Sequence, residues 1–129
     1  MMTLKIKTGT MALMAAVAIA GAAHAHPRLL ASSPAANTVA VAPAVIKLSF
    51  SERLVGKMSA ADLFMTGMKG MPHHPAMKVG GVKAAMLADG KTLVLTTAKP
   101  LSAGTYQVNW RAVTMDTHRV QGSFTFAVK

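Results

Sequence analysis

The chain has 129 residues, the size of one domain, and its fourteen Lys and Arg against four Asp and Glu give a net charge of +10. It contains no cysteine, which excludes disulfides and also a blue-copper electron-transfer site, whose defining ligand is a cysteine thiolate. The basic residues are scattered and the few aromatic residues alternate as they do in strands, so nucleic acid is not expected as a partner.

The first 25 residues have the pattern of a secretory signal peptide. Lys5 and Lys7 form a basic start, and an apolar run follows from Met11 to Ala23. This run is shorter than the roughly 20 residues that a membrane-spanning helix needs. The small residues of Ala23-His24-Ala25 supply a cleavage site, so we expect cutting after Ala25 and a mature domain of residues 26–129. The mature net charge is +8, since only two of the fourteen Lys and Arg are removed.

The mature chain alternates apolar and polar residues in short runs, which is typical of half-buried β-strands. The run at 45–50 places Ile46, Leu48 and Phe50 on one face, and the run at 106–111 is the cleanest in the sequence. Other strands are expected at 28–33, 62–66, 91–97 and 124–128, with a hairpin turn at Asp89-Gly90. Segment 77–86 is interrupted by two glycines and is interpreted as a strand with a bulge. No helical pattern appears, which indicates an all-β antiparallel sandwich or barrel.

The stretch from 65 to 77 holds four methionines and two histidines within thirteen residues. Glycines at 67 and 70 and prolines at 72 and 75 argue against a helix and favour a surface loop. Clustered methionines usually fill gaps in a core, but a surface loop offers no core to fill. Thioether sulfur is a soft ligand that suits Cu(I), and imidazole binds copper in either oxidation state. We therefore interpret this segment as a Cu(I)-binding loop.

A second group of ligand-type residues is Asp116-Thr117-His118, just after the strand at 106–111. In an extended segment, residues two apart point the same way, so Asp116 and His118 can face one metal. The motif is weak alone, because a lone histidine is usually hydrogen-bonded and a nearby Asp often only orients it. It is stronger when His26 is the first residue, since its α-amine and imidazole can chelate the same ion. An amine, two imidazoles and a carboxylate make the tetragonal set that Cu(II) prefers.

The mature sequence resembles the CopC family of periplasmic copper-binding, copper-resistance proteins over essentially its whole length. The features that carry the resemblance are His26-Pro27, Ser32-Ser33-Pro34-Ala35, Leu48-Ser49-Phe50-Ser51-Glu52, the loop at 65–77, and Gly104-Thr105-Tyr106 with Trp110-Arg111-Ala112-Val113 leading to Asp116-Thr117-His118. Together these features are specific, whereas any one of them alone is not. The resemblance implies a small immunoglobulin- or cupredoxin-like Greek-key β-barrel or sandwich with two copper sites at opposite ends.

The resemblance also implies the ligands of each site. The implied Cu(II) ligands are His26, Asp116 and His118, with the Glu52 carboxylate nearby but not bound to the ion. The implied Cu(I) ligands are Met65, Met68, Met71 and His73. Relative to the family pattern, Ala76 is inserted before Met77, which remains a candidate ligand, and His74 beside His73 is an alternative imidazole.

The position of signal-peptide cleavage decides the Cu(II) site. A cut after Ala23 would start the mature chain with His24-Ala25-His26, whose amine, backbone amides and third-position histidine can wrap Cu(II) without Asp116 or His118. We prefer the later cut, because Ala-His-Ala is the better small-residue signal and the family resemblance begins at His26.

The resemblance implies a non-catalytic periplasmic protein that carries, buffers or sequesters Cu(II) and Cu(I) in copper resistance and homeostasis. The implied partners are an inner-membrane copper transporter similar to CopD or other periplasmic copper-resistance proteins, and the protein is expected to be a monomer. The alternative is a copper monooxygenase-like redox enzyme with an N-terminal histidine brace. Asp116 as a fourth planar ligand argues against an enzyme, because a catalytic metal needs an open position. A purely structural β-domain would leave the ligand-rich loop unexplained.

Overall fold

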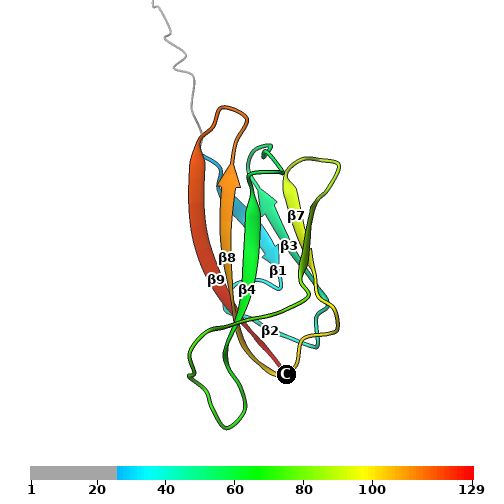
Figure 1. The fold of residues 1–129 in the computed structure, drawn as a ribbon, viewed down its shortest axis with the longest axis vertical. Helices are drawn as coiled ribbons and strands as arrows, with labels where there is room; N and C mark the ends of the chain where they lie inside the picture. Colours follow the sequence, from blue (N-terminus) through cyan, green and yellow to red (C-terminus); the bar gives the residue numbers. More distant parts are fainter. Residues whose placement is uncertain (1–25) are drawn as a thin grey trace, which may run out of the picture.

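The computed structural model describes residues 26–129, which form two β-sheets packed against each other (Figure 1). These residues contain nine strands and no helix, as the all-β prediction requires. Accordingly, no helix between His26 and Lys129 is long and apolar enough to cross a membrane. The predicted signal peptide, residues 1–25, lies outside the described residues.

One sheet has four strands in the order β1-β3-β7-β6, and the other has five in the order β2-β9-β8-β4-β5. The bounds are β1 Leu29–Ser33, β2 Val39–Ala40, β3 Val45–Phe50, β4 Ala60–Gly67, β5 Met77–Lys78, β6 Lys83–Met86, β7 Thr92–Thr96, β8 Gly104–Val113 and β9 Arg119–Val128. All neighbours are antiparallel except β2, a two-residue strand that pairs in parallel with β9 and that the sequence pattern did not reveal. Both sheets keep edge strands, so the fold is a sandwich and not a closed barrel.

The predicted alternation places the core between the two sheets. The buried inward residues of the three main strands are Ile46, Leu48, Phe50, Tyr106, Val108, Trp110, Phe124, Phe126 and Val128. The rings of Phe50 and Trp110 meet edge to face across the sandwich, with their centroids 5.2 Å apart. Gly122 lies opposite Trp110 in β9, and a Cβ at this position would stand 2.5 Å from the indole ring. The glycine therefore makes room for the only tryptophan of the chain.

The prediction of one bulged strand over 77–86 is wrong. β5 pairs with β4 in the five-stranded sheet, whereas β6 pairs with β7 in the four-stranded sheet. Between them, the amide of Val79 still donates to the carbonyl of Leu63 at 2.9 Å, and Gly81 adopts a φ of 73°. The glycines thus mark the point at which the chain crosses between the sheets, because glycine accepts a positive φ at little cost.

The strand directions place the two predicted metal-binding segments at opposite ends of the sandwich. β4 and β8 are antiparallel, with Ala60 opposite Arg111 and Gly67 opposite Thr105. The loop that follows β4 and the turn that follows β8 therefore project in opposite directions, as Figure 1 shows along the vertical axis. The described chain begins at the same end as the β8–β9 turn.

Candidate metal sites

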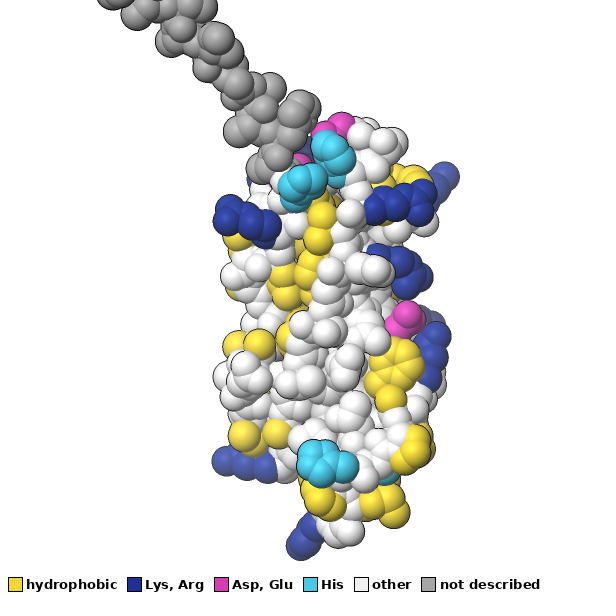
Figure 2. Space-filling view, turned by 90° about the vertical axis from the view of Figure 1, so that its left-hand side faces the viewer, with side chains coloured by type: hydrophobic (Ala, Val, Ile, Leu, Met, Phe, Trp, Pro, Cys, Tyr) yellow, Lys and Arg dark blue, Asp and Glu magenta, His cyan; other side chains and the backbone are white. Residues whose placement is uncertain are grey.

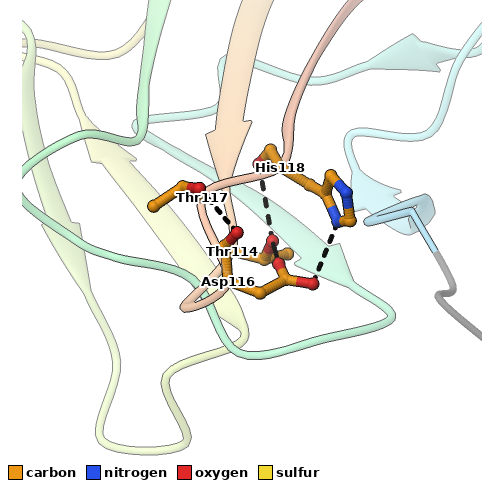
Figure 3. Close-up of polar contacts among 4 residues, drawn as sticks. All are labelled: Thr114, Asp116, Thr117 and His118. Atoms are coloured by element: carbon orange, nitrogen blue, oxygen red, sulfur yellow. Dashed lines mark hydrogen bonds and ion pairs between the residues drawn. The ribbon is translucent and has the colours of Figure 1, made fainter. Parts of the chain in front are cut away.

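The turn between β8 and β9 carries Asp116 and His118 (Figure 3). The amide of Thr114 donates to the carbonyl of His118 at 3.0 Å, and the amide of Thr117 donates back to the carbonyl of Thr114 at 2.9 Å. Thr117 adopts a φ of 69°, so the prediction that this segment is extended is wrong. The two side chains nevertheless meet, because the tight turn brings His118 Nδ1 to 3.0 Å from Asp116 Oδ2.

The Asp116 carboxylate is held ionised by its neighbours. The Thr114 hydroxyl donates a hydrogen bond to Asp116 Oδ1 and is the main reason why the pKa of this carboxyl is lowered from its ordinary value of 3.8. The backbone amide and the ring of His118 lower the pKa further, against the opposing effect of burial. The side chains of Asp116 and His118 are 50% and 41% exposed, so an ion from solvent can reach them.

His26 lies against the same turn. Pro27 is fully buried. Arg28 makes two hydrogen bonds with Ser51, both at 2.9 Å: the Arg28 amide donates to Ser51 Oγ, and the Ser51 amide donates to the Arg28 carbonyl. These contacts fix the chain directly after His26. The rings of His26 and His118 meet edge to face with centroids 5.1 Å apart, and in Figure 3 the His118 ring points toward the blue start of the described chain.

The three predicted Cu(II) ligands therefore form a chain of contacts in space, in which His118 contacts both His26 and Asp116. Glu52 follows Ser51 at the same end of the sandwich and is half-buried. Within residues 26–129, no three His, Asp or Glu side chains are already arranged closely enough to hold a metal ion. The side chains alone are thus an incomplete site, and the predicted ligand set adds the α-amine of His26 to them.

The methionine segment is a narrow β-ribbon with its methionines in two cross-strand pairs. Met65 in β4 is directly opposite Met77 in β5, so both side chains lie on one face, and both line a surface pocket of about 370 Å³. At the tip, the amides of Met68 and Met71 each donate to the other residue's carbonyl at 2.9 Å, and Gly70 with a φ of 82° closes the turn. The predicted loop is therefore shorter than thirteen residues, because both of its ends belong to strands.

Glycines hold the base of this ribbon closed. A Cβ at Gly67 would lie 2.2 Å from the Pro72 carbonyl oxygen and 2.5 Å from Thr105 Oγ1. A Cβ at Gly104 would lie 2.5 Å from the Gly67 carbonyl oxygen and 3.0 Å from the Met65 methyl group. The segment can fold back onto the end of β4 only because both positions lack a side chain.

The two histidines of the ribbon differ in their surroundings. His73 is exposed, whereas His74 is half-buried and its amide donates to the carbonyl of Thr66 at 3.1 Å. Met68, Met71 and Met77 are exposed by 37%, 52% and 55%, while Met65 is half-buried and packs against the core. Exposed thioethers on an ordered ribbon are available to a ligand, which is the condition that a Cu(I) site requires.

In the part of the chain that the structure describes, the histidines gather at the two ends of the molecule, as Figure 2 shows in cyan. One end combines imidazoles with acidic side chains, and the other combines imidazoles with hydrophobic side chains, among which the methionines are counted. Nitrogen and oxygen donors suit Cu(II), and thioether with imidazole suits Cu(I). The fold and the two donor sets thus define a small β-sandwich protein with a nitrogen- and oxygen-rich end and a thioether-rich end.

Comparison with known proteins agrees with this class. Residues 29–129 match the CopC domain family, so the chain belongs to the CopC family. It is 51% identical to "Copper resistance protein C" of Xanthomonas campestris pv. juglandis, over 93% of each chain, and 50% identical to the protein of that name from Pseudomonas syringae pv. tomato, over 89% of this chain and 90% of the relative. The crystal structure of PcoC, described as a methionine-rich copper resistance protein from Escherichia coli, matches with 50% identity and a TM-score of 0.74, over 81% of this chain and 100% of PcoC.

The predicted family and fold class are thereby confirmed. The role of Thr114, whose hydroxyl hydrogen-bonds the Asp116 carboxylate, was not expected from the sequence, nor was the role of Gly67 and Gly104 in closing the methionine ribbon. Threonine and aspartate are both residues that favour turns, so Thr114 and Asp116 together are a turn signal in the sequence. The close approaches at Gly67 and Gly104 leave no comparable signal, because they depend on which strands lie side by side.

Proposed function

We propose that the protein is a periplasmic copper-binding protein that holds Cu(II) at one end and Cu(I) at the other, and so carries, buffers or sequesters copper in copper resistance. The observation that supports this most strongly is the separation of two chemically different donor sets at opposite ends of one sandwich (Figure 2). Soft and harder ligands select different oxidation states, so neither set would serve both ions equally well.

At the Cu(II) end, the proposed ligands are the α-amine and ring of His26, the ring of His118 and the Asp116 carboxylate. The amine becomes available when the signal peptide is cut after Ala25. Burial of Pro27 and the Arg28–Ser51 hydrogen bonds hold the new terminus against His118, so the site would be ordered as soon as cleavage occurs. The Glu52 carboxylate stands at this end and would add negative charge near the ion.

At the Cu(I) end, the proposed ligands are the paired thioethers Met65 with Met77 and Met68 with Met71, together with one imidazole of the ribbon. The register of β4 with β5 supports Met77 despite the inserted Ala76, because it places Met77 opposite Met65. Thioethers carry no proton and no charge, so this end would favour a soft monovalent ion over Cu(II).

We propose that the protein is not an enzyme. Asp116 lies beside His118, with Oδ2 3.0 Å from Nδ1, and as a proposed fourth ligand it would fill the position that a catalytic copper keeps open for oxygen. The names of the relatives describe copper resistance and give no support to an oxidase. Catalytic oxygen consumption by the copper-loaded wild-type protein with an excess of reductant would support the enzyme instead.

A copper carrier needs a donor and an acceptor. The proposed partners are an inner-membrane copper transporter similar to CopD or other periplasmic copper-resistance proteins, and the carrier itself is proposed to act as a monomer. With the two ions at opposite ends, one partner could engage one end while the other end stays exposed.

The proposal is tested by variants that remove one donor set at a time from the exported protein. Asp116→Ala should weaken Cu(II) binding by about tenfold or more and leave Cu(I) binding unchanged. The double variant Met68→Leu with Met71→Leu, which conserves side-chain volume, should do the reverse. Met86→Leu is the matched control, because Met86 is half-buried against the core in β6 and belongs to neither proposed donor set.

Affinities are measured by competition with chelators of known affinity, in air for Cu(II) and under strict anaerobic conditions for Cu(I). Quenching of Trp110 fluorescence and circular dichroism report whether each variant is folded. A wild-type protein that binds neither ion, or variants that weaken both ions alike, would contradict the assignment of one ion to each end.

A further inference from the structure

The side chain of His74 has an unusual environment for a residue on a surface ribbon. Its Nδ1 lies 2.8 Å from the carbonyl oxygen of Pro75. A carbonyl oxygen can only accept a hydrogen bond, so Nδ1 must be the nitrogen that carries the proton. In the neutral ring, Nε2 is then the nitrogen with the available lone pair.

This Nε2 is shielded from solvent and has no hydrogen-bond partner among the described residues 26–129. Leaving a shielded polar atom without a partner is unfavourable, which is why such atoms are rare in folded proteins. The cost is removed if the atom coordinates a metal ion. A proton donated to a backbone carbonyl by the other ring nitrogen is also the usual arrangement of a metal-binding histidine, because it fixes the tautomer and the ring orientation.

The backbone around His74 fixes the position of this ring. The amide of His74 donates to the carbonyl of Thr66, which lies between Met65 and Met68 along the chain. Gly67 next to it accommodates the returning Pro72 carbonyl. His74 is therefore held across from the strand end that carries the thioethers, whereas the side chain of His73 is exposed to solvent.

We propose that His74, through Nε2, supplies the imidazole ligand of the thioether site, and that His73 does not. This inference rests on the proposed Cu(I) function of the ribbon and names its nitrogen donor. It departs from the ligand that the family pattern implied, since that pattern points to His73. His74, the additional histidine relative to the family pattern, is thus the ligand, and the exposed His73 lies outside the site.

The test uses Ag(I), a soft monovalent ion that does not change oxidation state, with the exported protein and its His73→Ala and His74→Ala variants. His74→Ala should lose about tenfold or more in Ag(I) affinity, while His73→Ala should match the wild type. Long-range ¹H–¹⁵N spectra of the histidine rings should show a large shift of His74 Nε2 on addition of Ag(I), with His73 unmoved. A third variant, His74→Met, should restore binding, because it replaces the imidazole with another soft donor.

The outcomes separate this inference from the function on which it rests. If the wild type binds no Ag(I), the proposed soft-metal site itself is wrong. If the wild type binds but His73→Ala is the variant that loses affinity, or the ¹⁵N shift appears on His73, the assignment to His74 is overturned. Equal losses of Ag(I) affinity in both alanine variants would also overturn it. If His74→Ala does not fold, the ¹⁵N shifts of the wild-type histidines on addition of Ag(I) decide between His73 and His74.

Discussion

The rings of His26 and His118 meet edge to face, with centroids 5.1 Å apart, although they come from opposite ends of the described chain. This contact ties the first residue of the predicted mature protein to the turn between the last two strands. It exists because Pro27 is buried directly after His26 and because β9 returns along β8 to bring the turn to this end. The proposed Cu(II) site therefore depends on where the signal peptide is cut as well as on the fold.

A chain extended before His26 should bind Cu(II) poorly. Retaining Ala25 converts the α-amine of His26 into a peptide nitrogen and moves the free amine one residue away from the His118 ring. We expect a loss of about tenfold or more in Cu(II) affinity, since one ligand of the proposed set is removed. Ag(I) affinity should not change, because the thioethers lie at the other end of the sandwich. Isothermal titration of the two forms measures both quantities, and equal Cu(II) affinities would show that the amine is not a ligand.

The two proposed sites should differ in their response to acid. Cu(II) must displace protons from an α-amine and from imidazoles, so its binding weakens as the pH falls from 7 to about 5. The softer site has one imidazole among thioethers that carry no proton, so binding of the softer ion should weaken much less over this range. Parallel titrations of Cu(II) and Ag(I) across these pH values test the difference. Loss of both ions in step would count against separate donor sets.

The close approach at Gly67 should make the methionine ribbon sensitive to one added methyl group. Gly67→Ala places a Cβ 2.2 Å from the Pro72 carbonyl oxygen, so the ribbon must move away from the end of β4. We expect a loss of about 1–3 kcal/mol in unfolding free energy and weaker Ag(I) binding with unchanged Cu(II) binding. Gly80→Ala is the matched control, because a Cβ there meets nothing within 4 Å. Urea unfolding and metal titration of both variants provide the comparison, and similar behaviour of the two would refute a positioning role for Gly67.

The turn at Asp89 and Gly90 should make stability fall in acid. The predicted hairpin turn is confirmed: Gly90 has a φ of 67°, and Asp89 Oδ1 accepts from the amides of Lys91 and Thr92 at 2.8 and 2.9 Å. The hydrogen bond from the Lys91 amide, with that from the Thr92 hydroxyl, holds the pKa of Asp89 below its ordinary value of 3.8. A carboxyl with a lowered folded-state pKa stabilises the fold above the unfolded-state pKa, and this contribution is lost as the pH falls through the folded-state pKa.

Replacement of this carboxyl should therefore matter most at neutral pH. Asp89→Ala should lower the melting temperature at pH 7, and the difference from the wild type should shrink as the pH falls below about 4. Thr92→Val, which removes one of the donors, should show a smaller loss with the same pH trend. Thermal unfolding followed by circular dichroism across this range measures both, and a difference that stays constant with pH would exclude the Asp89 carboxylate as its source.

The alternation of apolar residues predicted most of the strands, because burial on one face of a strand imposes a period of two. It succeeded at Ile46, Leu48 and Phe50 and again along β8 and β9. It failed between Met77 and Met86, where two short strands join different sheets, since periodicity carries no information about which sheet a strand joins. It also missed the two residues of β2, which are too few to show a period.

The residue types of the candidate sites could be identified from the sequence, whereas their local geometry could not. Asp116 and His118 do meet, but through a tight turn with Thr117 at a positive φ and not through an extended segment. The pairing of Met65 with Met77 follows from the register of β4 with β5, which the sequence does not reveal. The environment that distinguishes His74 from His73 likewise depends on the folded backbone, through the Thr66 and Pro75 carbonyls.

The most direct test of the central claim is the intact mass of the exported protein, measured without metal, with Cu(II), and with Cu(I) under anaerobic conditions. The account predicts a polypeptide that begins at His26 and gains one ion of each kind, with both retained when they are added together. A secreted chain that keeps residues 1–25, or a mature chain whose mass does not change with either ion, would contradict it.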